Sequence, residues 1–396
     1  MKRNLSLVIL CGGKGKRLGN ITKKTPKPLI KINKKPFIEY LINFYQRYKF
    51  DKIYLIGHYK SLQFNKIFHK KVFNFIKCEF IKEKKALDTG GALNTLRYRI
   101  KGDILLINGD SYLDYDFIKF YKFIYSHSSH AMILVKNKTY KSNKKLSNLK
   151  ISKNKKIIKA KNSKYMNAGI YFFKKEIFNL IKRNKSVSLE NDILPILINK
   201  KKMKGIYSND FFIDIGTKKN LDIAKQKLIN VIKRPAIFLD RDGVLNEDTG
   251  HAYQFKKMKW IKSSLDFLKN LNKNKFKFFI VTNQSGIARG IYSEKTFLDL
   301  HAKIKEFLIN KNIFIDDIRY CPHHPKFGIK KYKVNCKCRK PKNQMITDLI
   351  RYWDINTKKS IMIGDNHSDF LSAVKSNIKF YYHNKKNITK IIKKIG

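Results

Sequence analysis

Short apolar runs alternate along the chain with longer stretches in which apolar and polar positions follow a helical period. The apolar runs predict strands at Leu5–Leu10, Lys52–Gly57, Asp103–Ile107, Ala236–Leu239, Phe276–Thr282 and Ser360–Ile363. Regular alternation of strands with helices is typical of α/β domains built around mainly parallel sheets. We therefore expect an α/β fold along the whole chain.

This pattern restarts once, near the middle of the chain. The 396 residues exceed one ordinary core, so two or three domains are expected. Asp222–Ile232 has the pattern of a closing helix, and Pro235 marks a break before the next strand. We predict one domain over residues 1–230 and a second over residues 235–396.

The net charge is extreme, because 87 Lys and Arg residues outnumber 29 Asp and Glu residues and give +58. Such a charge is typical of proteins that bind nucleic acids or membrane surfaces. Here, however, the lysines are spread along the whole chain and accompany abundant Asn, Ile, Phe and Tyr, which indicates compositional drift that also suits anionic substrates. We find no RNA-recognition, zinc-finger-helix or basic-zipper motif, so no nucleic-acid partner is expected.

Two lysine-rich segments are predicted to form surface structures. Lys136–Lys161 is predicted to form a surface hairpin or a lid, and Lys385–Gly396 a basic terminal helix.

No apolar run reaches about 18 residues, so we expect no membrane span. The N-terminus has the pattern of a strand and a phosphate loop, not of a secretory signal. With clustered cysteines that suit a metal better than disulfides, these features predict a cytoplasmic protein.

Chemically distinctive loops follow the first strand of each predicted domain. After Leu5–Leu10 comes a loop that contains Gly12, Gly13 and Gly15, and after Ala236–Leu239 comes Asp240-Arg241-Asp242-Gly243. In open α/β sheets, ligands bind at the carboxyl ends of the strands. Both loops therefore mark expected binding sites.

The second loop suits covalent phosphoryl transfer. Residues two apart in an extended chain point the same way, so Asp240 and Asp242 can face one pocket. One carboxylate would attack phosphorus while the other protonates the leaving oxygen and later activates water. A hydroxyl and an amide at Thr282-Asn283, cations at Arg339-Lys340 and a carboxylate at Asp365 follow in order.

This order of motifs resembles the haloacid-dehalogenase superfamily, which implies a haloacid-dehalogenase-like fold for the second domain. The resemblance implies that Asp240 is the nucleophile and Asp242 the general acid and base. It further implies that Thr282 and Asn283 bind the phosphoryl oxygens and that Lys340 stabilises nucleophile and phosphate. Arg339 would add a further contact to the substrate.

Two metals are expected in this half. The resemblance implies Mg²⁺ held by Asp240, Asp365 and the backbone carbonyl of Asp242. A second set of residues combines three thiols and one imidazole, a tetrahedral zinc set, and consists of Cys321, His323, Cys336 and Cys338. The alternative is a pair of unrelated reduced cysteine turns. Together with the segments Val281–Gly290 and Phe238–Asn246, these motifs resemble the histidinol-phosphate and heptose-bisphosphate phosphatase branch, in which the zinc is structural.

The first half contains a different set of motifs. The Gly-rich loop ends in Arg17 and precedes Pro26-Lys27-Pro28, and backbone N–H groups of such a loop can cradle phosphates. These segments resemble the sugar-1-phosphate nucleotidyltransferases, which implies a nucleotide-diphospho-sugar transferase fold. The matching residues downstream are Thr89, Gly90, Asp110, Asn167, Glu190 and Asp214.

By this resemblance, Asp110 and Asp214 hold Mg²⁺, while Arg17 and Lys27 stabilise the phosphates of a nucleoside triphosphate. Nucleotide and sugar would be bound by Gly12, Gly13, Gly15, Thr89, Gly90, Asn167 and Glu190. The family often has a Glu-Lys pair before the strand at Asn167, and here only Lys161 remains to supply the cation.

The combination of the two halves indicates the pathway. A phosphatase that removes the 7-phosphate of heptose 1,7-bisphosphate makes heptose 1-phosphate, which a nucleotidyltransferase can activate. The first half is most similar to heptose-1-phosphate guanylyltransferases, so GTP and a GDP-sugar for surface polysaccharide are favoured. One alternative is another hexose-1-phosphate nucleotidyltransferase fused to a histidinol-phosphatase-like enzyme. The other is a basic nucleic-acid-binding protein on inactive enzyme folds.

Overall fold

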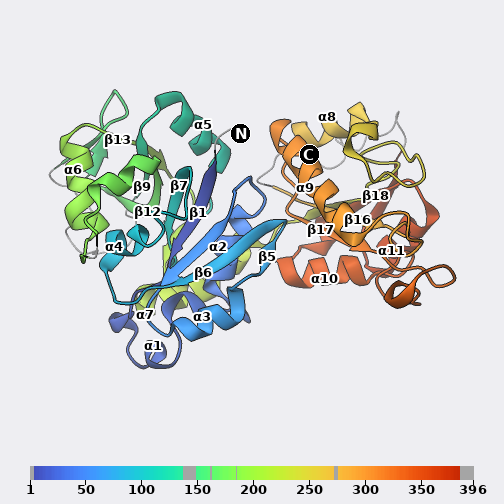
Figure 1. Ribbon diagram of the computed structural model, residues 1–396, viewed down its shortest axis with the longest axis horizontal. Coiled ribbons are helices and arrows are strands. Elements are labelled where there is room, and N and C mark those ends of the chain that lie inside the picture. The colour runs from blue at the N-terminus through green and yellow to red at the C-terminus, as the bar shows by residue number, and fades with distance from the viewer. Residues whose placement is uncertain (1–3, 137–148, 161–162, 184, 272–274, 384–396) are drawn as a thin grey trace. The chain divides into compact units, whose positions relative to one another are not determined.

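The computed structural model describes residues 4–136, 149–160, 163–183, 185–271 and 275–383. Its chain forms two compact units, each with its own sheet (Figure 1). The first unit runs to Tyr45 and continues from Phe50 to Val231, and the second comprises Gln46–Lys49 and the chain from Ile232 onward. Lys161 and the segment Lys385–Gly396 lie outside the described residues.

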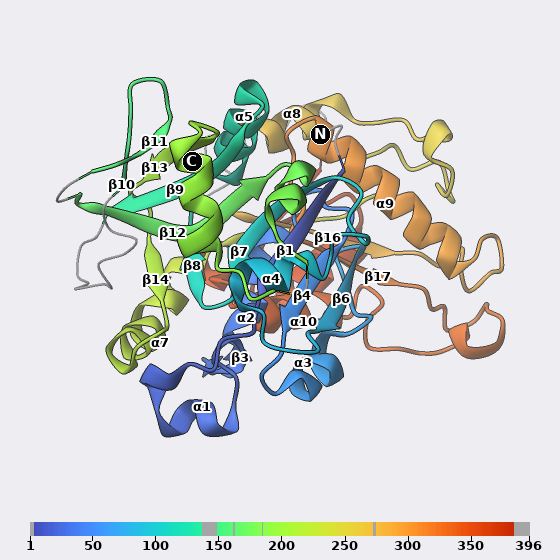
Figure 2. The same ribbon diagram turned by 60° about the vertical axis from the view of Figure 1, so that its left-hand side comes forward.

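An eight-stranded sheet forms the centre of the first unit (Figure 2). In spatial order its strands are β13 (Met203–Ser208), β9 (His130–Lys136), β12 (Tyr165–Phe173), β7 (Asp103–Asn108), β1 (Leu5–Leu10), β4 (Ile53–Gly57), β6 (Ile76–Lys82) and β5 (Val72–Phe73). The neighbours β7, β1, β4 and β6 are parallel, while β12 runs antiparallel to both of its neighbours. The prediction of a mainly parallel sheet is confirmed.

Both faces of this sheet are covered. Every residue of β1 from Leu5 to Ile9 is buried, and side chains alternate between the faces of a strand. Continuous burial of this kind is typical of parallel strands that lie between two layers of helices. The helices of the first unit are α1 (Asn20–Lys24), α2 (Phe37–Tyr45), α3 (Ser61–Phe68), α4 (Asp88–Asn94), α5 (Phe117–His127), α6 (Leu194–Asn199) and α7 (Lys218–Ile232).

Three small two-stranded sheets complete the first unit. They are β2 (Lys31–Ile32) with β3 (Lys35–Pro36), β8 (Ser111–Leu113) with β14 (Phe212–Asp214), and β10 (Leu149–Ile151) with β11 (Ile157–Lys159). The β10–β11 pair is an antiparallel hairpin within the segment predicted to be a hairpin or a lid. The first part of that segment, residues 137–148, lies outside the described residues.

The second unit contains a five-stranded sheet in which all strands are parallel. In spatial order they are β17 (Asp317–Cys321), β16 (Lys277–Asn283), β15 (Ala236–Leu239), β18 (Ile361–Gly364) and β19 (Lys379–Tyr382). The central strand β15 is buried along its whole length, so this sheet is also covered on both faces. Its helices are α8 (Lys262–Asn270), α9 (Glu294–Asn310), α10 (Gln344–Trp353) and α11 (His367–Lys375).

The six strands predicted from the apolar runs are all present, and each of their ends lies within one residue of the prediction. The closing helix α7 also forms, and it begins four residues before the predicted Asp222. In the described part of the chain, no helix is long and apolar enough to cross a membrane.

Candidate active sites

A cavity of about 250 Å³ opens at the carboxyl ends of the parallel strands in the first unit. The Gly-rich loop after β1 contributes Gly12 and Gly13 to its wall, and Asp110 follows β7. Gly15 has a positive φ of 65°, and a Cβ there would lie 2.8 Å from the Thr22 side chain. This position therefore requires glycine, which lets the loop turn without strain.

Two acidic side chains are brought together beside this cavity by the pairing of β8 with β14. Asp214 lies opposite Ser111 in this pair, and the Ile215 N–H donates to the Asp110 carbonyl over 2.9 Å. Burial raises the pKa of Asp214 to about 6, and the nearby Asp110 carboxylate adds to this rise. Lys27 opposes it, and its Nζ lies 2.6 Å from Asp110 Oδ2.

Arg17 completes the charged group. A Cβ added to Gly216 would lie 3.1 Å from Arg17 Nη2 and 2.7 Å from Asp214 Oδ1, so the guanidinium and the carboxylate share the space above this glycine. Arg17 also lowers the pKa of Asp214, more weakly than Lys27 does. Two carboxylates and two cations thus gather beside this cavity, and such a group can bind phosphates and a divalent cation.

A hydrogen-bonded chain extends from the other side of the cavity. Thr89 Oγ1 donates to Glu190 Oε2 over 2.8 Å and accepts from the Leu189 N–H over 2.8 Å. Asn167 Nδ2 donates to the buried Tyr171 hydroxyl over 2.7 Å. A β-bulge in β12 between Asn167 and Tyr171 places both side chains in this network.

Gly90 allows two segments beside the cavity to pack closely together. A Cβ at Gly90 would lie 2.9 Å from the Val187 carbonyl, which instead accepts a hydrogen bond from the Gly90 N–H over 2.8 Å. The start of α4, with Thr89, therefore lies directly against the segment that leads to Glu190.

The second unit gathers its acidic side chains at the carboxyl ends of β15 and β18. Ligand oxygens of Asp240, Asp365 and Asp369 all lie within 4.8 Å of one another. Gly243 has a φ of 78°, and a Cβ there would lie only 2.0 Å from Asp365 Oδ2. The absence of a side chain at this position allows Asp365 to lie against the loop that carries Asp240.

Lys340 lies buried among these carboxylates. Its Nζ is 2.9 Å from Asp240 Oδ2 and 2.5 Å from Asp369 Oδ1, and it donates to the Val281 carbonyl over 2.9 Å. Burial alone would lower the pKa of Lys340, but the two carboxylates outweigh this effect and raise it. Burial also raises the pKa of Asp240 to about 7, although Lys340 opposes the rise.

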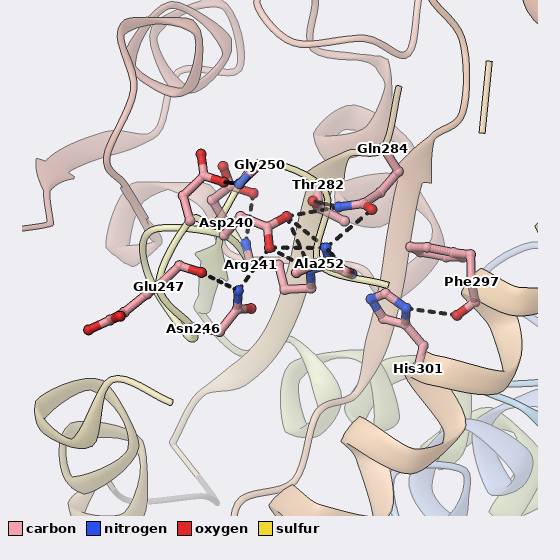
Figure 3. Close-up of polar contacts among 12 residues, drawn as sticks. Asp240, Arg241, Asn246, Glu247, Gly250, Ala252, Thr282, Gln284, Phe297 and His301 are labelled. Atoms are coloured by element: carbon pink, nitrogen blue, oxygen red, sulfur yellow. Dashed lines mark hydrogen bonds and ion pairs between the residues drawn. The ribbon is translucent and has the colours of Figure 1, made fainter. Parts of the chain in front are cut away.

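The carboxylate of Asp242 is held by donors from three residues. Arg241 Nη2 donates to Oδ2 over 2.8 Å, Asn246 Nδ2 donates to Oδ1 over 2.9 Å, and Gln284 Nε2 donates to Oδ2 over 3.0 Å. Figure 3 shows Arg241, Asn246, Thr282 and Gln284 around this point. The Asp242 carboxylate also contributes to the raised pKa of Asp240.

Comparison with known proteins agrees with this geometry. A nucleotidyl transferase family model matches residues 6–230, which is more than half of the chain, and a haloacid dehalogenase-like hydrolase model matches residues 310–382. The D-glycero-β-D-manno-heptose-1,7-bisphosphate 7-phosphatase of Haemophilus influenzae is 42% identical over 144 residues, 36% of this chain and 78% of that relative. The chain belongs to the nucleotidyl transferase family, and its second part to the family of these heptose-bisphosphate phosphatases.

Further relatives are similar to each part. The corresponding phosphatase of Rhodopseudomonas palustris is 36% identical over 163 residues, 41% of this chain and 91% of that relative. A crystal structure of HddC from Yersinia pseudotuberculosis with GMP-PN is 28% identical and covers 56% of this chain and 99% of its own, with a TM-score of 0.46.

The phosphatase part also brings together the expected zinc ligands. The three sulfur atoms of Cys321, Cys336 and Cys338 lie 3.2–3.4 Å apart, and His323 Nδ1 is 3.4 Å from the Cys338 sulfur. A disulfide would need about 2.05 Å, whereas four ligands around Zn²⁺ at about 2.3 Å lie roughly 3.8 Å from one another. These residues therefore fit a tetrahedral zinc ion, and the cluster could hold one.

Two residues predicted to contact phosphate also bond to backbone groups of the protein. Asn283 uses its side-chain amide on the Lys340 backbone: it donates to the carbonyl over 3.1 Å and accepts from the N–H over 3.1 Å. Arg339 Nη1 donates to the His323 carbonyl over 3.3 Å. Both contacts tie the segment that carries Lys340 to the sheet and to the cysteine cluster.

Several residues of these sites had no predicted role. Arg241 and Gln284 are buried beside Asp242, and their only signal was their position within the motifs around Asp240 and Thr282. Asp369 likewise had no predicted role, yet it forms an ion pair with Lys340. Glu83 follows β6, lines the nucleotidyl transferase cavity and is buried, which raises its pKa.

Proposed function

We propose that this chain is a bifunctional enzyme of nucleotide-activated heptose synthesis. Its phosphatase part removes the 7-phosphate of D-glycero-D-manno-heptose 1,7-bisphosphate, and its nucleotidyl transferase part couples heptose 1-phosphate to a nucleoside triphosphate, with GTP favoured. The observation that carries the proposal is the union of these two families in one chain, because the product of the first reaction is a substrate for the second.

In the phosphatase reaction, an Asp240 carboxylate oxygen attacks phosphorus and forms the aspartyl phosphate. The bond from phosphorus to the sugar oxygen breaks, and Asp242 gives that oxygen its proton. Lys340 neutralises charge on Asp240 and on the phosphoryl group, and Thr282 donates to a phosphoryl oxygen. Water then attacks phosphorus as Asp242 takes up its proton, and phosphate leaves Asp240.

Mg²⁺ would be held by Asp240, Asp365 and the backbone carbonyl of Asp242, and it would supply charge neutralisation between carboxylate and phosphate. The close approach of Asp365 to Asp240 supports this assignment. Zinc at the cysteine cluster would have a structural role, because it would fix the loop that leads to Lys340.

In the nucleotidyl transferase reaction, a phosphate oxygen of the sugar 1-phosphate attacks the α-phosphorus of the triphosphate, and pyrophosphate leaves. Positioning and charge neutralisation dominate such chemistry. We assign the phosphates to Arg17, Lys27 and the backbone of the Gly-rich loop, and Mg²⁺ to Asp110 and Asp214. The nucleotide and the sugar would be held by Thr89, Asn167 and Glu190.

The most direct experiment is a coupled assay. The purified protein is incubated with heptose 1,7-bisphosphate, Mg²⁺ and each nucleoside triphosphate in turn, and the products are identified by mass spectrometry. The proposal predicts GDP-heptose, with phosphate and pyrophosphate released in equal amounts. Phosphate release from histidinol phosphate together with activation of only another hexose 1-phosphate would contradict it. Tight RNA binding without turnover would favour the nucleic-acid alternative.

A further inference from the structure

Gln284 makes a full set of hydrogen bonds in the phosphatase site. It is 3% exposed and lies between the phosphate-binding candidate Thr282 and the acid-base candidate Asp242. Its Nε2 donates to Asp242 Oδ2 over 3.0 Å and to Thr282 Oγ1 over 2.9 Å. Its Oε1 accepts from Arg241 Nη2 over 3.2 Å (Figure 3). The same oxygen accepts from the Tyr292 hydroxyl over 2.6 Å. An amide can make four such bonds, and all four are made here.

The neighbours of Gln284 allow only one orientation of its amide. A guanidinium has donors and no acceptor, so the group that faces Arg241 must be the oxygen. An ionised carboxylate has acceptors only, so the group that faces Asp242 must be the nitrogen. A flipped amide would place two donors against each other at Arg241 and two acceptors against each other at Asp242.

This fixed orientation determines where the Thr282 proton points. Because Gln284 Nε2 donates to Thr282 Oγ1, the hydroxyl is an acceptor toward Gln284 and its single proton must be donated to another group. Thr282 is the last buried residue of β16, the strand that lies parallel to β15 and ends at the same edge of the sheet as Asp240. A phosphoryl oxygen bound at Asp240 is the acceptor for which that proton is available.

We propose that Gln284 is a positioning residue of the phosphatase reaction, which directs the Thr282 proton toward the phosphoryl group and holds Asp242 in place for proton transfer. This inference rests on the proposed function. Gln284 exchanges no proton itself. The sugar oxygen still receives its proton from Asp242 as its bond to phosphorus breaks, and the attacking water later returns a proton to Asp242.

Gln284→Glu tests the inference because it changes the polarity of the group with little change in shape. The new carboxylate would oppose Asp242 and would attract the Thr282 proton. Gln284→Met removes the same donors without adding charge, and it is the test variant to use if Gln284→Glu does not fold. Gln344→Glu makes the same chemical change at an exposed position at the start of α10 and is the matched control.

Kinetics with two substrates distinguish a positioning role of Gln284 from a general loss of structure in its variants. A sugar phosphate needs a protonated leaving oxygen, whereas p-nitrophenolate leaves without a proton. For heptose 1,7-bisphosphate we expect kcat to fall by about 10²-fold, which is typical when general acid-base catalysis is lost. The first turnover of p-nitrophenyl phosphate should fall by only about tenfold, the contribution of one hydrogen bond. A burst of p-nitrophenol should then precede a slow steady state, because hydrolysis of the aspartyl phosphate also uses Asp242.

Equal losses with both substrates, or unchanged kinetics in both Gln284 variants, would overturn the inference. If the wild-type protein released phosphate from neither substrate, the proposed function would itself fail. That result is distinguishable, because it does not depend on any Gln284 variant.

Discussion

Lys340 carries a buried ammonium group between the carboxylates of Asp240 and Asp369, and its side chain is 1% exposed. An ion of this kind is stable in the interior only because both partners are present. The same group lies where the phosphoryl charge would develop, so its structural and chemical roles cannot be separated by position alone. A substitution should therefore change both stability and activity.

We expect Lys340→Met to abolish phosphate release and to lower the free energy of unfolding of the phosphatase unit by about 3–5 kcal/mol, because it leaves two buried carboxylates without their cation. Urea denaturation and a phosphate assay measure the two effects. Lys375→Met, an exposed lysine on α11, is the control and should change neither. A stable, active Lys340→Met protein would contradict the assignment.

His130 begins β9, and its Nδ1 accepts a hydrogen bond from the Lys174 N–H over 3.2 Å. Burial lowers its pKa from 6.5 to about 4, although Glu176 opposes this shift. The unfolded chain therefore takes up the proton first as the pH falls. His130 should contribute stability fully above about pH 6.5 and lose it down to about pH 4.

This loss should amount to about 3 kcal/mol, since each pKa unit corresponds to about 1.4 kcal/mol. Thermal unfolding of the nucleotidyl transferase unit between pH 7 and pH 4 measures it. His130→Gln cannot take up a proton in this range and should flatten the pH dependence. An unchanged slope in that variant would show that other groups are responsible.

Which site residues could be predicted from the sequence depends on the chemistry of each residue. That Asp240 lies beside Lys340, and that three cysteines lie beside His323, could be predicted because few other residues do their chemistry at such spacings. Arg241 and Gln284 could not be assigned a role, because a buried hydrogen-bond partner has no sequence signature of its own. Asn283 and Arg339 were predicted as phosphate contacts, but whether their side chains face substrate or backbone depends on distances that a motif does not contain.

At the scale of elements, both sites follow from the way parallel strands end. In the phosphatase unit, the acidic loops follow the neighbouring strands β15 and β18, so Asp240 and Asp365 reach the same edge of the sheet. In the nucleotidyl transferase unit, Asp110 and Asp214 are far apart in sequence, and the short β8–β14 pair brings them together. Strands as short as these have too few residues for a periodic pattern, so their pairing could not be predicted.

The cysteine cluster holds a loop of the phosphatase unit in place. Cys321 ends β17, and Cys336 and Cys338 precede Lys340 by a few residues, so the cluster joins the sheet to the active-site lysine. A loop without regular structure keeps one conformation only if side chains or a metal restrain it.

We expect Cys336→Ser to lower the zinc content of the protein and to reduce phosphate release at least about tenfold, with pyrophosphate release unchanged. The loss of zinc should act by freeing the Lys340 segment, and loss of a residue that supports a metal site commonly costs about 10–100-fold in activity. Elemental analysis and the two assays measure this. Cys78→Ala, which changes a cysteine of the other unit, is the control. Equal zinc content in the wild-type protein and both variants would contradict zinc binding by the cluster.

At the scale of the whole molecule, the chain joins two sets of proposed catalytic side chains. Each set lies within its own unit, and the family matches fall on separate stretches of sequence. The two reactions therefore need not share any residue. They need only share an intermediate, the heptose 1-phosphate.

Complementation between two inactive variants tests this central claim most directly. Asp240→Asn should form no aspartyl phosphate, and Asp110→Ala should transfer no nucleotide, so neither protein alone should convert heptose 1,7-bisphosphate and GTP into GDP-heptose. We predict that an equimolar mixture of the two restores GDP-heptose, measured by mass spectrometry, because each protein retains the activity that the other lacks. No product from the mixture, although each variant keeps its remaining activity on its own substrate, would contradict consecutive action by two independent sites.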